Sequence, residues 1–458
     1  MNKFLYKSGL AALALAAFLS SCKPEIDAPK ASAGEANFER YVSLGNSLTA
    51  GFADGALYRG GQEVSYPNIL AQQFKLVGGG EFRQPLLAEA VEASSPKING
   101  SNIILDHRLK LASVTDCMGT SLSPVVSGST TYTAQELFVK FAPTNQGPYN
   151  NLGVPGAKSF HLIAPNYGDP MGIFANPRTA NPFFVRFAAS PSVTILEQAM
   201  AQNPTFLSLW IGNNDVLGYA TQGGDGDEII TPKANFEFAI NQIINAMALK
   251  NVKGVIANIP DLTKAPFFTT VPYNGLVLKR QGQADSLKAA YRGAVNFKVG
   301  QNPFMVVEDG TVRPITSEEL ILLPASSAIK CQGLGSRTPI PDNLVLSKPE
   351  IDAIRNAVAD YNEALKRLVD NANAAKPNSL AFVDAYSILN EIAGGISRNQ
   401  VTYNTALVTG NIFSLDGLHF SPRGNAIVAN EFIKAINEKY KSSIPTVNET
   451  NYNTVLFP

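Results

Sequence analysis

The chain has 458 residues, of which 45% are apolar, and its 37 Lys and Arg balance 37 Asp and Glu. This composition supplies a sizeable core and excludes a mainly disordered chain. A nucleic-acid-binding protein normally carries a basic excess, so the zero net charge argues against a nucleic-acid partner. The three Cys and three His are scattered, which argues against a structural zinc module. At roughly 150 residues per domain, the length allows about three domains.

The amino terminus has the pattern of a secretory signal. Two early lysines precede an apolar run from Leu10 to Leu19, which is too short to span about 30 Å of hydrocarbon as a helix. The sequence that follows, Ser20-Ser21-Cys22, completes a motif that resembles the lipobox of bacterial lipoproteins. The resemblance implies a signal peptide over residues 1–21 and lipidation of Cys22.

A lipid on Cys22 would make the membrane a partner of the protein and would place the protein in the bacterial cell envelope, with the outer membrane as the expected site. Residues 22–36 are polar and rich in Pro and Ala, which predicts a flexible tether. No later run reaches 18 apolar residues, so no transmembrane helix is predicted. An extracytoplasmic location permits disulfides. Cys117 and Cys331 therefore either pair or remain as two buried free thiols.

Short apolar runs alternate with amphipathic segments along the chain. The apolar runs are rich in β-branched residues and apolar on both faces, as parallel strands covered by helices are. The amphipathic segments have apolar residues at helical spacing, and one opens with a Ser-x-x-Glu capping-box pattern. The predicted strands are Arg40–Leu44, Pro204–Ile211, Lys253–Ile259 and Leu380–Ala385, and the predicted helices are Phe236–Lys250, Ser347–Asn373 and Gly424–Lys439.

This alternation predicts an α/β fold, a three-layer α/β/α sandwich with a mostly parallel sheet and a site at the carboxyl ends of the strands. The domain is expected over residues 37–445 and is followed by a C-terminal tail over residues 446–458. Two stretches rich in Ser, Thr, Gly and Pro, at about 78–146 and 264–341, do not fit the alternation. They are interpreted as insertions, and each contains one of the two spare cysteines.

Four polar patterns lie near the ends of the predicted elements. Gly45-Asn46-Ser47 follows the first strand and would place a hydroxyl at a helix start, near N–H groups that stabilise negative charge. Residues 151–157 form a Gly/Pro turn with exposed N–H groups, and residues 212–215 supply Asn amide donors. In residues 416–421 an Asp precedes a His by three positions, a spacing that lets the carboxylate fix the imidazole tautomer.

Each pattern alone is common in turns and caps. Together and in this order they resemble the SGNH or GDSL hydrolase superfamily, over residues 38–78, 147–262 and 342–438. The resemblance implies a flavodoxin-like sheet and a serine esterase or acylhydrolase that cleaves acyl esters of lipids, glycans or small molecules through an acyl-enzyme. It implies no metal or organic cofactor. The oligomeric state stays open.

The family's roles can be carried over by position. Ser47 would be the nucleophile, His419 the general base, and Asp416 the residue that orients His419. The oxyanion would be held by the backbone N–H groups of Ser47 and Gly156 and by the side-chain amide of Asn214. Of the three histidines, only His419 has an Asp at triad spacing.

Two features depart from the family pattern. Asn46 replaces the acidic residue of the Gly-Asp-Ser-Leu signature, which leaves the triad intact but changes local hydrogen bonds. About a hundred residues separate the first two motifs, so the first insertion either caps the cleft or lies at an edge without a role.

Gly156 is preferred to Gly153 as the oxyanion glycine because the family's motif has a small residue after the glycine.

The alternative is a non-catalytic binding or structural lipoprotein on the same scaffold, with the insertions as its useful surface. A scaffold that had lost its chemistry would be expected to lack at least one of the four side chains that the reaction needs. Because all four are present, the sequence favours an enzyme.

Overall fold

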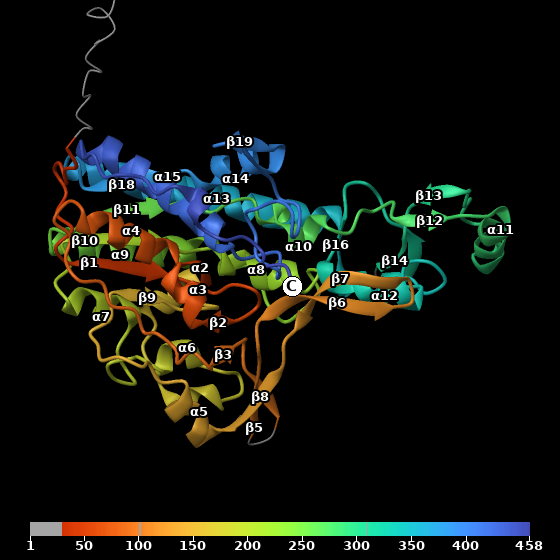
Figure 1. Ribbon diagram of the computed structural model, residues 1–458, viewed down its shortest axis with the longest axis horizontal. Coiled ribbons are helices and arrows are strands. Elements are labelled where there is room, and N and C mark those ends of the chain that lie inside the picture. Colours follow the sequence, from red (N-terminus) through yellow and green to blue (C-terminus); the bar gives the residue numbers. More distant parts are fainter. Residues whose placement is uncertain (1–29, 100–101, 309) are drawn as a thin grey trace, which may run out of the picture.

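The computed structural model describes residues 30–99, 102–308 and 310–458, so Cys22 and the predicted signal peptide lie outside the described residues. A five-stranded parallel sheet forms its centre, in the order β18-β11-β10-β1-β9 (Figure 1). Numbered by chain order these strands run 2-1-3-4-5, which is the flavodoxin-like topology. The predicted fold class is confirmed. The strands are β1 (Tyr41–Gly45), β9 (Asn151–Gly153), β10 (Phe206–Trp210), β11 (Lys253–Ala257) and β18 (Leu380–Val383).

Helices cover both faces of this sheet because its strands are apolar on both faces. Successive side chains of a strand point to opposite faces. In β1, Tyr41 accordingly lies in one buried core while Val42 and Leu44 lie in the other. The first core is closed by α4 (Tyr66–Lys75) and α15 (Pro422–Tyr440), and the second by α7 (Ile195–Ala201), α9 (Lys233–Leu249) and α13 (Lys348–Ala375).

The start of α13 has the Ser347–Glu350 contact that its sequence predicts. Ser347 N and Ser347 Oγ both donate to Glu350 Oε2, at 2.7 and 2.8 Å.

Shorter elements connect these layers. The remaining core elements are α2 (Ser47–Ala50), β2 (Leu57–Tyr58), α3 (Arg59–Glu63), α6 (Pro182–Val185), α8 (Asn214–Thr221), α14 (Ala385–Gly394), β19 (Ile396–Arg398) and β20 (Val401–Tyr403). The 3-10 helices are η1 (Ser159–Ile163), η2 (Pro170–Ile173), η3 (Leu262–Lys264), η4 (Leu323–Ala325), η5 (Asp342–Leu344) and η6 (Glu449–Asn451).

The two unassigned stretches of the sequence form structures of their own. An antiparallel hairpin of β6 and β7 leaves the core and extends toward α12 (Figure 1). The first stretch contains β3 (Glu92–Ala93), β4 (Lys97–Asn99), β5 (Asn102–Asp106), β6 (Leu109–Asp116), β7 (Gly119–Val126), β8 (Ser129–Thr133) and α5 (Ala134–Lys140). The second contains α10 (Pro266–Thr269), β12 (Leu276–Leu278), α11 (Gln281–Ala290), β13 (Gly300–Asn302), β14 (Met305–Glu308), β15 (Thr311–Pro314), β16 (Leu320–Ile321) and α12 (Ser326–Gln332), and it ends near β17 (Val345–Leu346).

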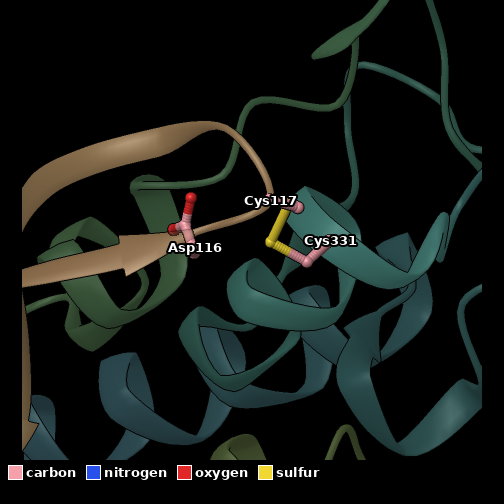
Figure 2. Close-up of side chains that lie close together, drawn as sticks. All are labelled: Asp116, Cys117 and Cys331. Atoms are coloured by element: carbon pink, nitrogen blue, oxygen red, sulfur yellow. A yellow bond between two sulfur atoms is a disulfide. The ribbon is translucent and has the colours of Figure 1, made fainter.

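A disulfide between Cys117 and Cys331 joins the two insertions (Figure 2). Cys117 lies in the turn between β6 and β7, Cys331 lies in α12, and the two residues are 214 positions apart in the sequence. Both cysteines are exposed. Asp116, which lies beside the bridge, pairs with Lys330 at 2.5 Å. The tip of the hairpin is therefore fixed to the second insertion by a covalent bond and an ion pair.

Residues 30–36, which were expected to belong to the tether, pack against the end of α15. Glu35 N donates to Tyr440 O at 2.8 Å, and Ser443 N donates to Ser32 O at 2.9 Å. Ala36 is buried. The described core therefore begins several residues before the predicted domain boundary. Within the described ranges, no helix combines the length and the apolar character needed to cross a membrane.

Candidate active site

Ser47 is the first residue of α2, and only Asn46 separates it from the end of β1. The side chain of Asn46 caps this helix, because its Oδ1 accepts the Leu48 N–H at 3.0 Å. Gly45 permits the close turn, since a Cβ there would lie 2.0 Å from Thr49 Oγ1. Ser47 is 7% exposed. The hydroxyl therefore lies at the carboxyl edge of the sheet in a fixed and nearly buried position.

His419 lies between Ser47 and Asp416. Its Nε2 is 2.8 Å from Ser47 Oγ, and its Nδ1 is 2.8 Å from Asp416 Oδ2. Asp416 Oδ1 also accepts the backbone N–H groups of Leu418 and His419, each at 2.9 Å. Gly417 has a φ of 72°, a left-handed conformation that glycine adopts without strain. One carboxylate therefore fixes both the course of this loop and the orientation of the imidazole.

The surroundings of Asp416 keep its carboxylate ionised. Burial alone would raise the pKa of Asp416, but the nearby His419 and several hydrogen bonds together hold this pKa well below its usual range. Two further donors are Gly55 N, at 2.8 Å, and Ser414 Oγ, at 3.1 Å. An ionised Asp416 accepts the proton on Nδ1 of His419. That tautomer leaves Nε2 able to take a proton from Ser47.

Gly156 and Asn214 follow the two strands that flank β1. Gly156 comes after β9, is exposed and has a φ of 80°, and within the described part of the chain its N–H donates to no protein acceptor. Asn214 begins α8 after β10, and its Nδ2 donates to Ala157 O at 2.9 Å, which leaves its second amide hydrogen for a ligand. Because β9 and β10 both pair with β1, these donors lie at the same sheet edge as Ser47.

The two glycines of the second motif have different surroundings. Gly153 is buried, and a Cβ on it would lie 2.3 Å from Ala50 N, so its lack of a side chain lets β9 approach α2. Among the described residues, the only atom that a Cβ on Gly156 would meet within 4 Å is Asn181 Nδ2, at 3.7 Å. Gly153 N already donates to Asn151 Oδ1 at 3.0 Å, so of the two glycines the exposed Gly156 is the one whose N–H a ligand could bond.

Buried polar side chains join the three loops that follow β1, β9 and β10. Asp215 is fully buried and accepts hydrogen bonds from Ser159 N at 2.8 Å and Ser159 Oγ at 2.6 Å. Burial raises the pKa of Asp215. Asn46, the residue that departs from the family signature, donates from Nδ2 to Asn213 Oδ1 at 3.4 Å. An ionised aspartate could not make this last contact, because it has no proton to donate.

Both insertions contact the Asp–His loop, defined here as residues 414–419. Leu111 of β6 is buried in a cluster with Leu415 of the loop and Val455 of the C-terminal tail. Phe267 of α10, in the second insertion, donates its N–H to Gly417 O at 3.0 Å. The bases of the insertions thus belong to the surroundings of the site, while their distal parts extend away from the core (Figure 1).

Asp54 is a neighbour of the site that the sequence analysis missed. It precedes Gly55 in a turn in which both residues have positive φ, and its N–H donates to Ser414 Oγ at 2.9 Å. An Asp-Gly pair is a strong signal for such a turn. That signal was present in the sequence, but it does not indicate which distant segment the turn contacts.

The sheet order defines a flavodoxin-like α/β/α fold, and Ser47, His419 and Asp416 lie in hydrogen-bond contact at its carboxyl edge. The family model for GDSL-like lipase/acylhydrolase matches residues 112–432, which is more than half of the chain. The chain therefore belongs to the GDSL-like lipase/acylhydrolase family. The matched range includes Gly156, Asn214, Asp416 and His419 but not Ser47, so the assignment of Ser47 depends on its motif and its geometry.

A comparison with curated proteins finds no match. Among solved structures, a protein from Parabacteroides merdae described as a GDSL-like lipase is 14% identical to this chain. The similarity covers 62% of this chain and 71% of that one, with a TM-score of 0.27. This score is too low to support a structural comparison, so the fold assignment depends on the strand order and the family match.

Proposed function

We propose that the protein is a serine esterase or acylhydrolase that cleaves acyl esters of lipids, glycans or small molecules. The observation that carries this proposal is a pair of consecutive hydrogen bonds. His419 Nε2 lies 2.8 Å from Ser47 Oγ, and His419 Nδ1 lies 2.8 Å from Asp416 Oδ2. Membership of the family supplies the general class, a hydrolase. The three side chains supply the reaction type, because this arrangement activates a serine hydroxyl as a nucleophile.

In the proposed reaction, His419 Nε2 accepts the Ser47 proton while Oγ forms a bond to the ester carbonyl carbon. The carbonyl electron pair moves to oxygen and returns as the bond to the alcohol breaks, and His419 gives its proton to that alcohol. Water then attacks the acyl-enzyme with the same two proton transfers. The carboxylic acid leaves, and Ser47 is restored.

Replacing Asn214 with Ala is expected to lower kcat by about 10²- to 10³-fold with a smaller effect on KM. The amide would stabilise the oxyanion of the transition state more than the carbonyl of the bound ester. Steady-state kinetics with a p-nitrophenyl ester would measure the change. Asn245→Ala, at an exposed position on α9, is the matched control. A kcat for Asn214→Ala equal to that of the control would remove Asn214 from the oxyanion hole.

We further propose that lipidated Cys22 anchors the protein in the bacterial cell envelope, with the outer membrane as the expected site. The apolar run before Cys22 supports this location, and so does the disulfide, since such bonds persist in oxidising compartments. Metabolic labelling with a fatty acid tests it. Label and membrane association are expected for the wild type and should be lost in Cys22→Ser. Equal labelling of both proteins would contradict the anchor.

A series of p-nitrophenyl esters from acetate to palmitate tests the enzymatic function. Wild-type protein is expected to hydrolyse part of the series with saturation kinetics, and the preferred chain length would define the acyl pocket. Ser47→Ala is the reference for background hydrolysis. Equal, slow hydrolysis of every ester by both proteins would show that the protein is not an esterase on these substrates.

The second candidate is a non-catalytic binding or structural lipoprotein on the same scaffold. The observation that favours it is the size of the two linked insertions, which project well beyond the core (Figure 1). This candidate predicts background hydrolysis throughout the ester series. Saturable, Ser47-dependent turnover would exclude it.

A further inference from the structure

Asp54 and Gly55 form a tight turn next to the Asp–His loop. The flanking residues Ala53 and Ala56 exchange backbone hydrogen bonds at 3.1 and 3.0 Å. The central residues have φ values of 54° and 77°. Positive φ at both positions is the geometry of a two-residue type I′ turn, for which Asp-Gly is a preferred pair. The sequence therefore supports this turn locally, although no long strand flanks it.

The turn donates to and accepts from three consecutive residues of the Asp–His loop. Asp54 N donates to Ser414 Oγ at 2.9 Å, and Gly55 N donates to Asp416 Oδ2 at 2.8 Å. In the opposite direction, Leu415 N donates to Asp54 Oδ1 at 3.0 Å. Residues 414–416 are thus held from outside by the turn, which lies about 360 residues earlier in the chain.

Ser414 provides a second connection to the triad acid. Its Oγ accepts from Asp54 N and donates to Asp416 Oδ1 at 3.1 Å. A displacement of the turn would therefore reach the Asp416 carboxylate by two routes, through Gly55 N and through the Ser414 hydroxyl.

The other side of the turn is held by the first insertion. Asp54 O accepts the Leu109 N–H at 2.7 Å, at the start of the hairpin, and Asp54 Oδ2 accepts the Tyr58 hydroxyl at 3.0 Å. The Arg108 guanidinium lies 4.4 Å from the centre of the Tyr58 ring and pairs with Glu92 at 3.1 Å. Asp54 therefore connects the base of the hairpin to the loop that carries Asp416.

We propose that Asp54 is a positioning residue, whose carboxylate fixes Leu415 and so keeps the Asp416 carboxylate directed at His419. Through this turn the first insertion supports the geometry of the triad. Asp54 bonds none of the atoms that react in the proposed mechanism, and the inference rests on the proposed esterase function. Loss of its side chain would let Asp416 shift, and a misplacement of about 1 Å at a catalytic group costs on the order of a hundredfold in rate.

Two substitutions separate the side-chain acceptor from the backbone conformation. Asp54→Gly keeps the positive φ but removes the acceptor for Leu415 N. Asp54→Asn keeps an Oδ1 acceptor and also tolerates positive φ. Burial, together with the neighbouring charge of Asp416, raises the pKa of Asp54, so a neutral amide is expected to be accommodated there.

Steady-state kinetics with the ester that the wild type prefers would test the proposal. Asp54→Gly is expected to lower kcat by about tenfold to a hundredfold while KM stays within about twofold. Asp54→Asn should retain kcat within about threefold. Asn251→Gly is the matched control, because Asn251 is exposed, has a φ of 60° and lies between α9 and β11 at the opposite edge of the sheet. Its kinetics should equal those of the wild type.

A spectroscopic readout makes the test independent of turnover. The proton between His419 Nδ1 and Asp416 should give a low-field ¹H resonance in the full chain, because it lies in a short, charge-assisted hydrogen bond. Asp54→Gly should shift or broaden this resonance, whereas Asp54→Asn should preserve it. An unchanged resonance and kcat in Asp54→Gly would overturn the inference. So would a loss in Asp54→Gly that Asp54→Asn does not restore.

If Asp54→Gly does not fold, as judged by circular dichroism, Asp54→Ser replaces it. This variant shortens the side chain, removes the carboxylate oxygen that accepts the Leu415 N–H, and is expected to lower kcat by about tenfold. A kcat and a low-field resonance equal to those of the wild type would then overturn the inference. Absence of wild-type turnover is a different result. It would contradict the proposed function, while the resonance would still report whether Asp54 positions Asp416.

Discussion

Replacing Ser47 with Ala is expected to lower kcat for ester hydrolysis by a factor on the order of 10⁵ to 10⁶, with KM little changed. Ser47 Oγ is the atom that would bond the acyl group, and it lies 2.8 Å from the His419 nitrogen that would take its proton. Without this oxygen no acyl-enzyme can form. The residual rate would come from substrate binding and from the oxyanion donors alone.

A fluorophosphonate probe checks this expectation without a substrate. The wild type should be labelled once per chain at Ser47, and Ser47→Ala should not be labelled. Ser286→Ala, on α11 in the second insertion, is the matched serine control and should be labelled like the wild type (Figure 1). Equal labelling of Ser47→Ala and the wild type would assign the nucleophile to another residue.

Replacing Asp416 with Asn is expected to lower kcat by about 10⁴-fold near neutral pH. The carboxylate accepts the Nδ1 proton of His419, whereas an amide can turn its NH₂ group toward Nδ1. The ring would then carry its proton on Nε2, facing Ser47, and could not act as a base. Steady-state kinetics measure this loss. Asp370→Asn, in an exposed ion pair with Lys366, is the control.

The depressed pKa of Asp416 gives the same substitution a stability signature. A carboxyl whose pKa is lower in the folded state stabilises that state above its unfolded pKa of about 4, and this contribution is lost as the pH falls through the folded value. Asp416→Asn should therefore unfold more easily than the wild type at pH 7, with the difference shrinking in acid. Chemical denaturation at several pH values measures it. A difference that stayed constant down to strongly acidic pH would show that the ionised carboxylate is not its source.

The long elements of the fold could be predicted because their pattern is local. The helical spacing and the capping box at Ser347 place α13 within two residues of its observed ends. β9 could not be predicted in this way. It has three residues, Asn151–Gly153, of which one is a large apolar residue, and it belongs to the sheet because it pairs with Ser43–Gly45 of β1.

At the candidate site, too, local sequence patterns could be predicted and long-range contacts could not. The motifs at Ser47, Gly156, Asn214 and His419 each occupy a few residues beside a strand or helix end, so the fold class itself predicts that they meet at one sheet edge. The role inferred for Asp54 depends on contacts with residues about 360 positions away, which no local pattern encodes.

The disulfide between Cys117 and Cys331 closes a ring of chain that contains some residues of the candidate site and leaves others outside it. β9, β10 and β11 lie inside the ring of chain that it closes, and so do Gly156 and Asn214, whereas Ser47 precedes the ring and His419 follows it. A single proteolytic cut within the ring leaves the polypeptide in one covalent piece. A cut between Ser47 and Cys117, or between Cys331 and His419, instead severs the proposed nucleophile or the proposed base from Gly156 and Asn214. The second insertion, at about residues 264–341, thus lies largely within the ring, where a single cut leaves the chain covalently connected.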